Sequence, residues 1–273
     1  MLKKLLFFFS VFSIGTAAGP VEFSSISYEQ GINEACRYAT ESEEHFSEFR
    51  RHLFCSNFID TLNDAFGWKY IHYVRDHYPD LLNRLTDFQK NEKIGTPYLG
   101  DYDHFGFFCP TTFRYIKIAG DLKFLFGNLN QKKIIEIGAG YGGQCRILSE
   151  LFSFKEYVII DLPEVLNLAK KYLDSLDVKN VRYIPADQIP SDLSCDLVIS
   201  NYAFSECSQE PQTVYMQKVL RNSKQGYMIC NTLGNKSFNQ DTCIEILQKE
   251  NIAAQVFPEL PYSADSNYLL IWK

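Results

Sequence analysis

Residues 132–144 read Lys-Lys-Ile-Ile-Glu-Ile-Gly-Ala-Gly-Tyr-Gly-Gly-Gln. The isoleucines in the first half of this stretch predict a short buried strand. Apolar residues between Cys145 and Phe152 then recur at helical spacing. A glycine-rich turn between a strand and a helix allows a ligand to lie against main-chain N–H groups. The pattern predicts a nucleotide-binding loop, and the alternative is a tight turn that holds no ligand.

Glycines occupy alternate positions of the predicted turn, at Gly138, Gly140 and Gly142. Gly138, Gly140 and Gly143 also fit the spacing of dinucleotide-binding loops, so the glycines alone leave NAD open. Glu136 lies two residues before the first glycine. A carboxylate there is unfavourable beside a pyrophosphate but useful beside a cationic amino-acid group. This position favours S-adenosylmethionine over NAD.

Strands and helices alternate from Lys132 onward. Predicted strands lie at 134–137, 157–161, 181–184, 196–200, 226–231, 255–257 and 268–272, and predicted helices follow Gly143, begin at Pro163, and lie at 212–220 and 241–250. Short apolar runs separated by helices predict an α/β doubly wound, mostly parallel sheet. The last two strands have no helical pattern between them, which predicts an antiparallel hairpin at the sheet edge. Seven strands with that hairpin fit a methyltransferase better than a nicotinamide dehydrogenase.

The part of the chain before the glycine loop has a different pattern. We expect a helical amino-terminal region at 19–126 that covers the acceptor cleft of a donor-binding domain at 127–273. Within it we predict a break in the helical pattern at 67–71, a short helix at 80–89, a loop at 95–110, and a helix from Pro110 to Phe126 that Gly127 ends.

Residues 1–18 have the layout of a secretory signal peptide, with two lysines, an apolar run and small residues in order. The apolar run is shorter than the ~20 residues that span a bilayer. A membrane anchor, with membrane contact through the amino terminus, is the alternative. Export or anchoring conflicts with a donor that is made in the cytosol, so the localisation stays open.

Composition limits the partners. The net charge is -6 and no block of Lys or Arg is present, which argues against a nucleic-acid partner. Among the eight cysteines, Cys145 and Cys230 fall in predicted buried elements, which favours buried thiols over disulfides. No Cys-x-x-Cys pair or Cys/His cluster predicts a metal site. Asp101, Asp103 and His104 are too few to predict a divalent metal site convincingly. The oligomeric state is not predicted.

The carboxyl ends of the predicted strands provide donor-binding candidates. Asp161 ends the second strand, about 20 residues beyond the glycines, where an acid binds ribose hydroxyls. Its alternative role is to cap the helix that follows Leu162, a further predicted donor contact. Asp187 and Gln188 follow the third strand and are candidates for the adenine edge, although Asp187 is nearly as well explained as a plain loop acid. Asn201 ends the fourth strand and is expected to line the donor and acceptor clefts.

Four stretches of the sequence resemble the sugar O-methyltransferases of bacteria. They are 110–115, 135–144, 161–165 and 200–206, and the resemblance is good from Pro110 to Glu206. It implies a class I methyltransferase fold, S-adenosylmethionine as the methyl donor and a hydroxyl as acceptor, on a sugar or another small molecule.

A sugar hydroxyl is a weak nucleophile at neutral pH, so a general base is expected. His104 is the first candidate because it lies in a loop rich in Gly and Asp, and a loop histidine without a role is the alternative. Glu206, close after the fourth strand, is the second candidate base, or else a plain acid at a helix start. Arg114 is a candidate partner for the donor carboxylate or for an acidic substrate, or else part of a surface salt bridge. Tyr202 is the other predicted substrate contact.

Two other functions remain open at this stage. A nicotinamide-dependent oxidoreductase is disfavoured by Glu136 and by the terminal strand pair. A non-catalytic, exported binding protein that retains the fold is supported by the signal-like residues 1–18.

Overall fold

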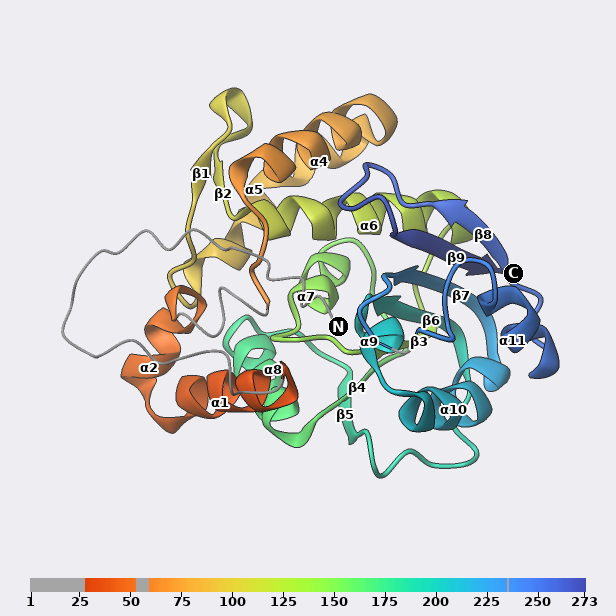
Figure 1. Cartoon of the computed structure of the whole chain (residues 1–273). Coiled ribbons are helices and arrows are strands. Elements are labelled where there is room, and N and C mark those ends of the chain that lie inside the picture. The colour runs from red at the N-terminus through yellow and green to blue at the C-terminus, as the bar shows by residue number, and fades with distance from the viewer. Residues whose placement is uncertain (1–27, 53–58, 235) are drawn as a thin grey trace, which may run out of the picture.

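The computed structural model describes residues 28–52, 59–234 and 236–273, and its centre is a seven-stranded sheet (Figure 1). The strands are β3 (Lys133–Ile137), β4 (Glu156–Asp161), β5 (Val181–Pro185), β6 (Cys195–Asn201), β7 (Ser223–Cys230), β8 (Gln255–Pro258) and β9 (Tyr268–Trp272), in the order β5-β4-β3-β6-β7-β9-β8. Strands β3 to β7 pair in parallel, and β9 pairs antiparallel with both β7 and β8. The predicted doubly wound α/β fold with a terminal antiparallel hairpin is confirmed.

The two faces of the sheet are each buried in a core, because successive side chains of a strand point to opposite faces. Ile134 and Ile159 lie in one core, and Ile135 and Ile160 lie in the other. The first face is covered by the amino-terminal region, α6 (Pro110–Phe126), α7 (Gly143–Ser149) and α8 (Pro163–Ser175). The second is covered by α9 (Ala203–Glu206), α10 (Gln209–Lys218), η6 (Leu220–Asn222) and α11 (Cys243–Lys249).

The amino-terminal region consists mainly of short helices. They are α1 (Tyr28–Glu41), α2 (Glu43–Glu48), η2 (Phe49–Arg51), α4 (Asp64–His77), η3 (Pro79–Arg84), α5 (Leu85–Phe88), η4 (Gln89–Lys93) and η5 (Asp103–Phe105). Figure 1 shows α1 beside α8 and α4 along α6, and these pairs are in contact. The region therefore packs on the same face of the sheet as α7.

Two details of this region differ from the prediction. Residues 67–71 do not break a helix but lie inside α4. The segment 95–110 contains a small hairpin of β1 (Gly100–Asp101) and β2 (Phe107–Phe108), in addition to loop. The helix from Pro110 to Phe126 is found where predicted, and Gly127 ends it with a φ of +73°.

The signal-like residues 1–18 lie outside the described residues. In the described part of the chain, no helix is both long enough and apolar enough to span a bilayer. Cys145 and Cys230 are fully buried free thiols, as predicted.

Candidate functional site

The glycine loop connects β3 to α7 at the edge where the parallel strands end. Gly138, Gly140 and Gly142 have φ angles of +74°, +55° and +91°, which favour glycine. A Cβ atom at Gly138 would lie 2.0 Å from the Cβ of Ala203, so α9 packs directly on the loop. The three predicted glycines thus form one turn, in which the amides of Gly138 and Gly142 donate to the carbonyls of Ile160 and Ala139.

Asp161 lies at the end of β4 beside this turn. Its Oδ1 accepts a hydrogen bond from the Leu162 amide at 2.8 Å, and its Oδ2 accepts one from the Gly140 amide at 3.3 Å. Burial raises the pKa of Asp161 to about 6, against the effect of the amides of Leu162, Gly140 and Ala139. The structure therefore brings Asp161 and Leu162 to the glycine loop, as expected from the spacing.

Glu136 lies under the loop and is fully buried. The Tyr157 hydroxyl donates to its Oε2 at 2.7 Å. Burial is the main cause that raises the pKa of Glu136 to about 8, and the nearby Asp161 acts in the same direction. No cation forms an ion pair with Glu136 among the described residues, so this carboxyl is held by a neutral donor.

The end of β6 supplies the next group of side chains. Asn201 is the last residue of β6, and its buried Oδ1 has no hydrogen-bond partner among the residues that the structure describes. Tyr202 follows with a φ of +73°, and its amide donates to the Ile229 carbonyl at 2.7 Å. Ala203 then begins α9 against Gly138. Asn201 and Tyr202 are therefore close to the loop.

Arg114 reaches the same edge from α6. Its guanidinium lies 5.4 Å from the ring centroid of Tyr202 and 5.9 Å from that of Tyr115. Tyr115 in turn packs on Gly143, where a Cβ atom would lie 2.4 Å from its ring. The Nε of Arg114 is buried without a hydrogen-bond partner, and the guanidinium forms no ion pair within the described ranges. The surface salt bridge considered for Arg114 is not found there.

The amino-terminal region also contacts the glycine loop. Ile59 is the nearest side chain to Gly140, 3.4 Å from the position of an added Cβ. Arg50 is fully buried, forms an ion pair with Asp60 at 2.6 Å, and lies 4.8 Å from the ring centroid of Tyr141. On the other side of the loop, burial and the nearby Asp161 raise the pKa of Cys36 in α1. The amino-terminal region thus forms part of the wall around the loop.

The other predicted residues are placed as follows. Asp187 and Gln188 are exposed and follow β5, the strand beside Asp161. Glu206 ends α9 and accepts a hydrogen bond from Asn231 Nδ2 at 2.7 Å, at the end of β7. All three lie at the edge where the strands end, and their roles stay predictions.

His104 is not brought to this edge. It lies in η5, at the tip of the β1–β2 hairpin, where it is exposed and its ring is tilted against that of Phe105. Figure 1 shows this hairpin at the far end of α4, well away from α9. The expectation that His104 faces the acceptor does not agree with this placement. Among the described residues, no group of His, Cys, Asp or Glu is placed to hold a metal ion.

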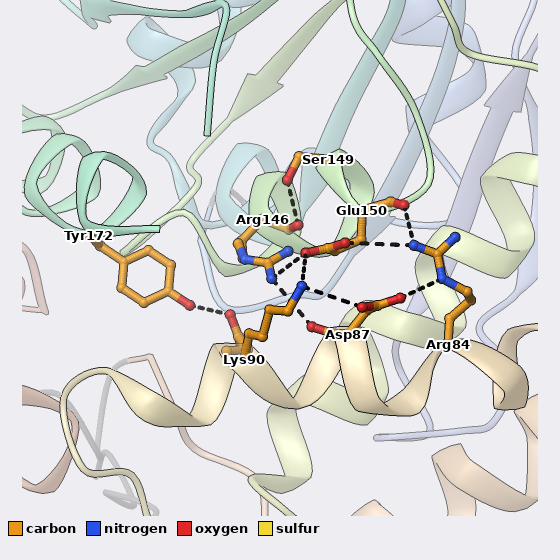
Figure 2. A network of polar contacts seen from close by, with 8 residues as sticks. Arg84, Asp87, Lys90, Arg146, Ser149, Glu150 and Tyr172 are labelled. Atoms are coloured by element: carbon orange, nitrogen blue, oxygen red, sulfur yellow. Dashed lines mark hydrogen bonds and ion pairs between the residues drawn. The ribbon is translucent and has the colours of Figure 1, made fainter. Parts of the chain in front are cut away.

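A charge network fixes the helix that follows the glycine loop (Figure 2). Arg146 Nη2 of α7 forms an ion pair with Glu150 at 2.6 Å. Arg84 and Lys90 approach Glu150 from the amino-terminal region, at 3.6 Å and 3.5 Å. Asp87 pairs with both of these cations. The network joins α7 to η3, α5 and η4, so the amino-terminal region helps to hold the helix that follows the glycine loop.

Sequence reasoning missed several residues at this edge. Tyr70, Glu259, Arg50 and Asp60 are buried here, but none of them belongs to a recognisable motif. Their partners are distant in sequence, so only the fold reveals them. Two open surface hollows are lined by the connection from α8 to β5, where β5 begins, and do not belong to this edge.

Comparisons with known proteins give only weak similarity. No protein-family model matches the chain, and no curated protein matches it. An rRNA methylase from Streptococcus thermophilus is 14% identical with a TM-score of 0.42, over 55% of this chain and 92% of that one. A SAM-dependent methyltransferase from Aquifex aeolicus is 15% identical with a TM-score of 0.43, over 56% and 87%. A protein from Thermoplasma acidophilum is 16% identical with a TM-score of 0.41, over 71% and 94%. Matches of this strength identify neither a donor nor an acceptor.

Proposed function

We propose that this chain is an S-adenosylmethionine-dependent O-methyltransferase that methylates a hydroxyl of a small molecule, a sugar in the first instance. The main support is a pair of unpartnered buried atoms beside the glycine loop. Arg114 offers a cationic donor and Asn201 offers a neutral acceptor, each without a hydrogen-bond partner in the described structure. An unpaired buried polar group is costly, so a ligand that satisfies both is expected.

An α-amino-acid group is complementary to this pair. Its carboxylate would pair with the Arg114 guanidinium, and its ammonium would donate to Asn201 Oδ1. S-adenosylmethionine has such a group next to its sulfonium, whereas NAD has none. Arg114 and Asn201 therefore favour S-adenosylmethionine as the donor, as Glu136 does, through different atoms.

The remaining donor contacts follow from the edge geometry. Asp161 would accept hydrogen bonds from the ribose hydroxyls, and Asp187 and Gln188 lie beyond the neighbouring strand for the adenine. Bound S-adenosylmethionine would supply an electrophilic methyl carbon. The chain would then have to orient an acceptor oxygen and exclude water, which can account for roughly 7–11 kcal/mol of rate acceleration in the best cases.

The acceptor side of the edge is polar. The hydroxyls of Tyr70, Tyr202 and Ser263 are near one another beyond the end of β6. Hydroxyl groups can donate and accept hydrogen bonds, which suits an acceptor with several hydroxyls. This is the support for a sugar-like acceptor over an apolar one.

The binding experiment compares three ligands by calorimetry. S-adenosylhomocysteine has the amino-acid group, 5′-methylthioadenosine lacks it, and NAD tests the oxidoreductase alternative. We expect wild type to bind S-adenosylhomocysteine best. Arg114→Met should lower the affinity for S-adenosylhomocysteine about tenfold or more and leave the affinity for 5′-methylthioadenosine unchanged.

Arg182→Met, on an exposed side chain of β5, is the control and should change neither affinity. Binding of NAD in preference to S-adenosylhomocysteine would overturn the proposal. An equal loss of affinity for S-adenosylhomocysteine and 5′-methylthioadenosine in Arg114→Met would show that Arg114 does not bind the amino-acid group.

A second candidate function is a non-catalytic, exported binding protein, which the signal-like residues 1–18 favour. We propose that transfer of a labelled methyl group from S-adenosylmethionine to a panel of methyl glycosides separates the two. A secreted, processed protein that binds the donor and never consumes it would favour the second candidate.

A further inference from the structure

Tyr202 has an unusual backbone conformation at the end of β6. Its φ is +73°, which is rare for a bulky side chain and costs about 1–3 kcal/mol. Such a conformation persists only where surrounding contacts hold it. The contacts of the Tyr202 side chain are therefore informative about its role.

The Tyr202 hydroxyl donates to a carboxylate oxygen of Glu259. The Oγ of Ser263 lies 3.3 Å from the same hydroxyl. The ring contacts Arg114, and the Tyr70 hydroxyl faces it without a regular hydrogen bond. Tyr202 is only partly buried, and a hydroxyl that donates its proton still has lone pairs that can accept a hydrogen bond.

Glu259 lies in the connection between β8 and β9 and is 1% exposed. In addition to Tyr202, its donors are the Ser263 hydroxyl at 2.5 Å and Asn267 Nδ2 at 3.1 Å. No Lys, Arg or His forms an ion pair with Glu259 in the described part of the chain. A buried carboxylate held only by neutral donors is costly to keep.

The position of Tyr202 relates this pair to the donor site. Tyr202 lies between Asn201, proposed to bind the amino group of the donor, and Ala203, which packs on Gly138. The connection that contains Glu259 approaches from the β9 side of the sheet, opposite the β4 side where Asp161 lies. The Tyr202 hydroxyl therefore lies on the acceptor side of the glycine loop.

We propose that Tyr202 accepts the proton of the acceptor hydroxyl while its own proton moves to Glu259. This inference rests on the proposed function. The acceptor oxygen forms its bond to the methyl carbon as the methyl–sulfur bond breaks, and the electron pair of that bond stays on the sulfur. The Glu259 carboxylate ends protonated, so one positive and one negative charge disappear together. Tyr202 is the catalytic residue, and Glu259 acts through it.

Two observations favour this path over a single carboxylate base. Burial, together with the nearby Glu259, raises the pKa of Tyr202 well above its ordinary value, so the phenol keeps its proton and acts as a relay. Glu206 instead accepts a hydrogen bond from Asn231 and has no contact with Tyr202 through its carboxylate. His104 lies outside this edge.

The test needs no acceptor and uses sinefungin, in which a carbon with an amino group replaces the methyl-bearing sulfur. That amine occupies the place of the transferred methyl group and donates to whatever faces it. We expect wild type to bind sinefungin more tightly than S-adenosylhomocysteine. Tyr202→Phe should lower the ratio of sinefungin affinity to S-adenosylhomocysteine affinity about tenfold, and Glu259→Gln should lower this ratio several-fold. The affinity for S-adenosylhomocysteine should be unchanged in both variants.

Unchanged S-adenosylhomocysteine binding also shows that each variant is folded, and Tyr98→Phe, on an exposed tyrosine of the β1 side, is the control. A ratio that neither Tyr202→Phe nor Glu259→Gln changes overturns the relay and leaves the proposed function intact. A ratio that falls only in Glu206→Gln assigns the base to Glu206. A wild type that binds neither compound overturns the proposed function, and the relay with it.

Discussion

Glu136 is an acid in a place where the fold provides no cation. Its side chain lies between β3 and α7, and the Tyr157 hydroxyl is its one side-chain hydrogen-bond donor among the described residues. Burial raises its pKa from 4.5 to about 8, so near neutral pH the folded protein holds a proton that the unfolded chain releases. Such a site is poorly suited to stability, which fits a residue kept for binding a cationic ligand.

This pKa leads to a prediction for stability. Because the folded-state pKa is the higher one, Glu136 lowers the free energy of unfolding progressively as pH rises from about 4.5 to about 8. Glu136→Gln removes this loss and keeps an acceptor for Tyr157. Urea unfolding should find the variant equal to wild type near pH 4 and more stable by at least about 1 kcal/mol at pH 8.5. A difference that is the same at both pH values would mean that Glu136 does not titrate in this window.

At the same scale, the sequence predicted the residues of local motifs and missed those that depend on long-range contacts. Asp161 could be placed beside the glycine loop because it follows a strand at a fixed distance from the glycines, and its role stays a prediction. Glu259 could not be found, because its partner Tyr202 is in another part of the chain and only the pairing of β7 with β9 brings them together. His104 was placed wrongly for the same reason, since a loop rich in Gly and Asp has no preferred location in the fold.

Among the elements, the turn between β3 and α7 packs directly on α9. Gly138 and Gly127 have nearly equal φ angles of +74° and +73°, but an added Cβ meets Ala203 at 2.0 Å in the first and nothing within 4 Å in the second. Gly127→Ala should therefore cost only the backbone strain, about 1 kcal/mol of stability. Gly138→Ala should lower the free energy of unfolding by at least about 2 kcal/mol and also lower the affinity for S-adenosylhomocysteine.

Urea unfolding and calorimetry on the two variants measure these effects. Equal losses of stability, with ligand binding retained in both, would show that α9 does not constrain the loop.

The strands of the sheet were predictable because each is an apolar run bounded by polar residues, a pattern that depends on burial of both faces. The prediction failed at Gly67, which was taken as a helix break. Gly67 lies within α4, where a Cβ would lie 2.0 Å from the Tyr102 hydroxyl. The glycine there allows close packing against the β1–β2 hairpin, a tertiary contact that the local pattern does not reveal.

At the scale of the whole molecule, a cluster of buried charges inside the amino-terminal region packs against Tyr141 of the glycine loop. Arg50 pairs with Asp60 and Glu92, and all three side chains are nearly inaccessible to solvent. Arg50→Met would leave two buried carboxylates without a cation, which should cost about 3–5 kcal/mol in the free energy of unfolding.

Lys171→Met is the matched control, because Lys171 joins α8 to an exposed glutamate, Glu43, of α2. Its loss should stay below about 1 kcal/mol. Urea unfolding measures both variants, and losses of similar size would argue that the buried ion pairs of Arg50 do not stabilise the fold more than an exposed pair does.

The placement of β9 between β7 and β8 has a consequence for how the sheet is made. The ribosome synthesises β8 before β9, yet β8 pairs only with β9 among the described strands. The edge of β7 that pairs with β9 therefore stays unpaired in the growing chain until residues 268–272 have been synthesised. Translation that stops before Tyr268 would leave that edge open to pairing with other chains, so truncated products should aggregate rather than accumulate as soluble fragments.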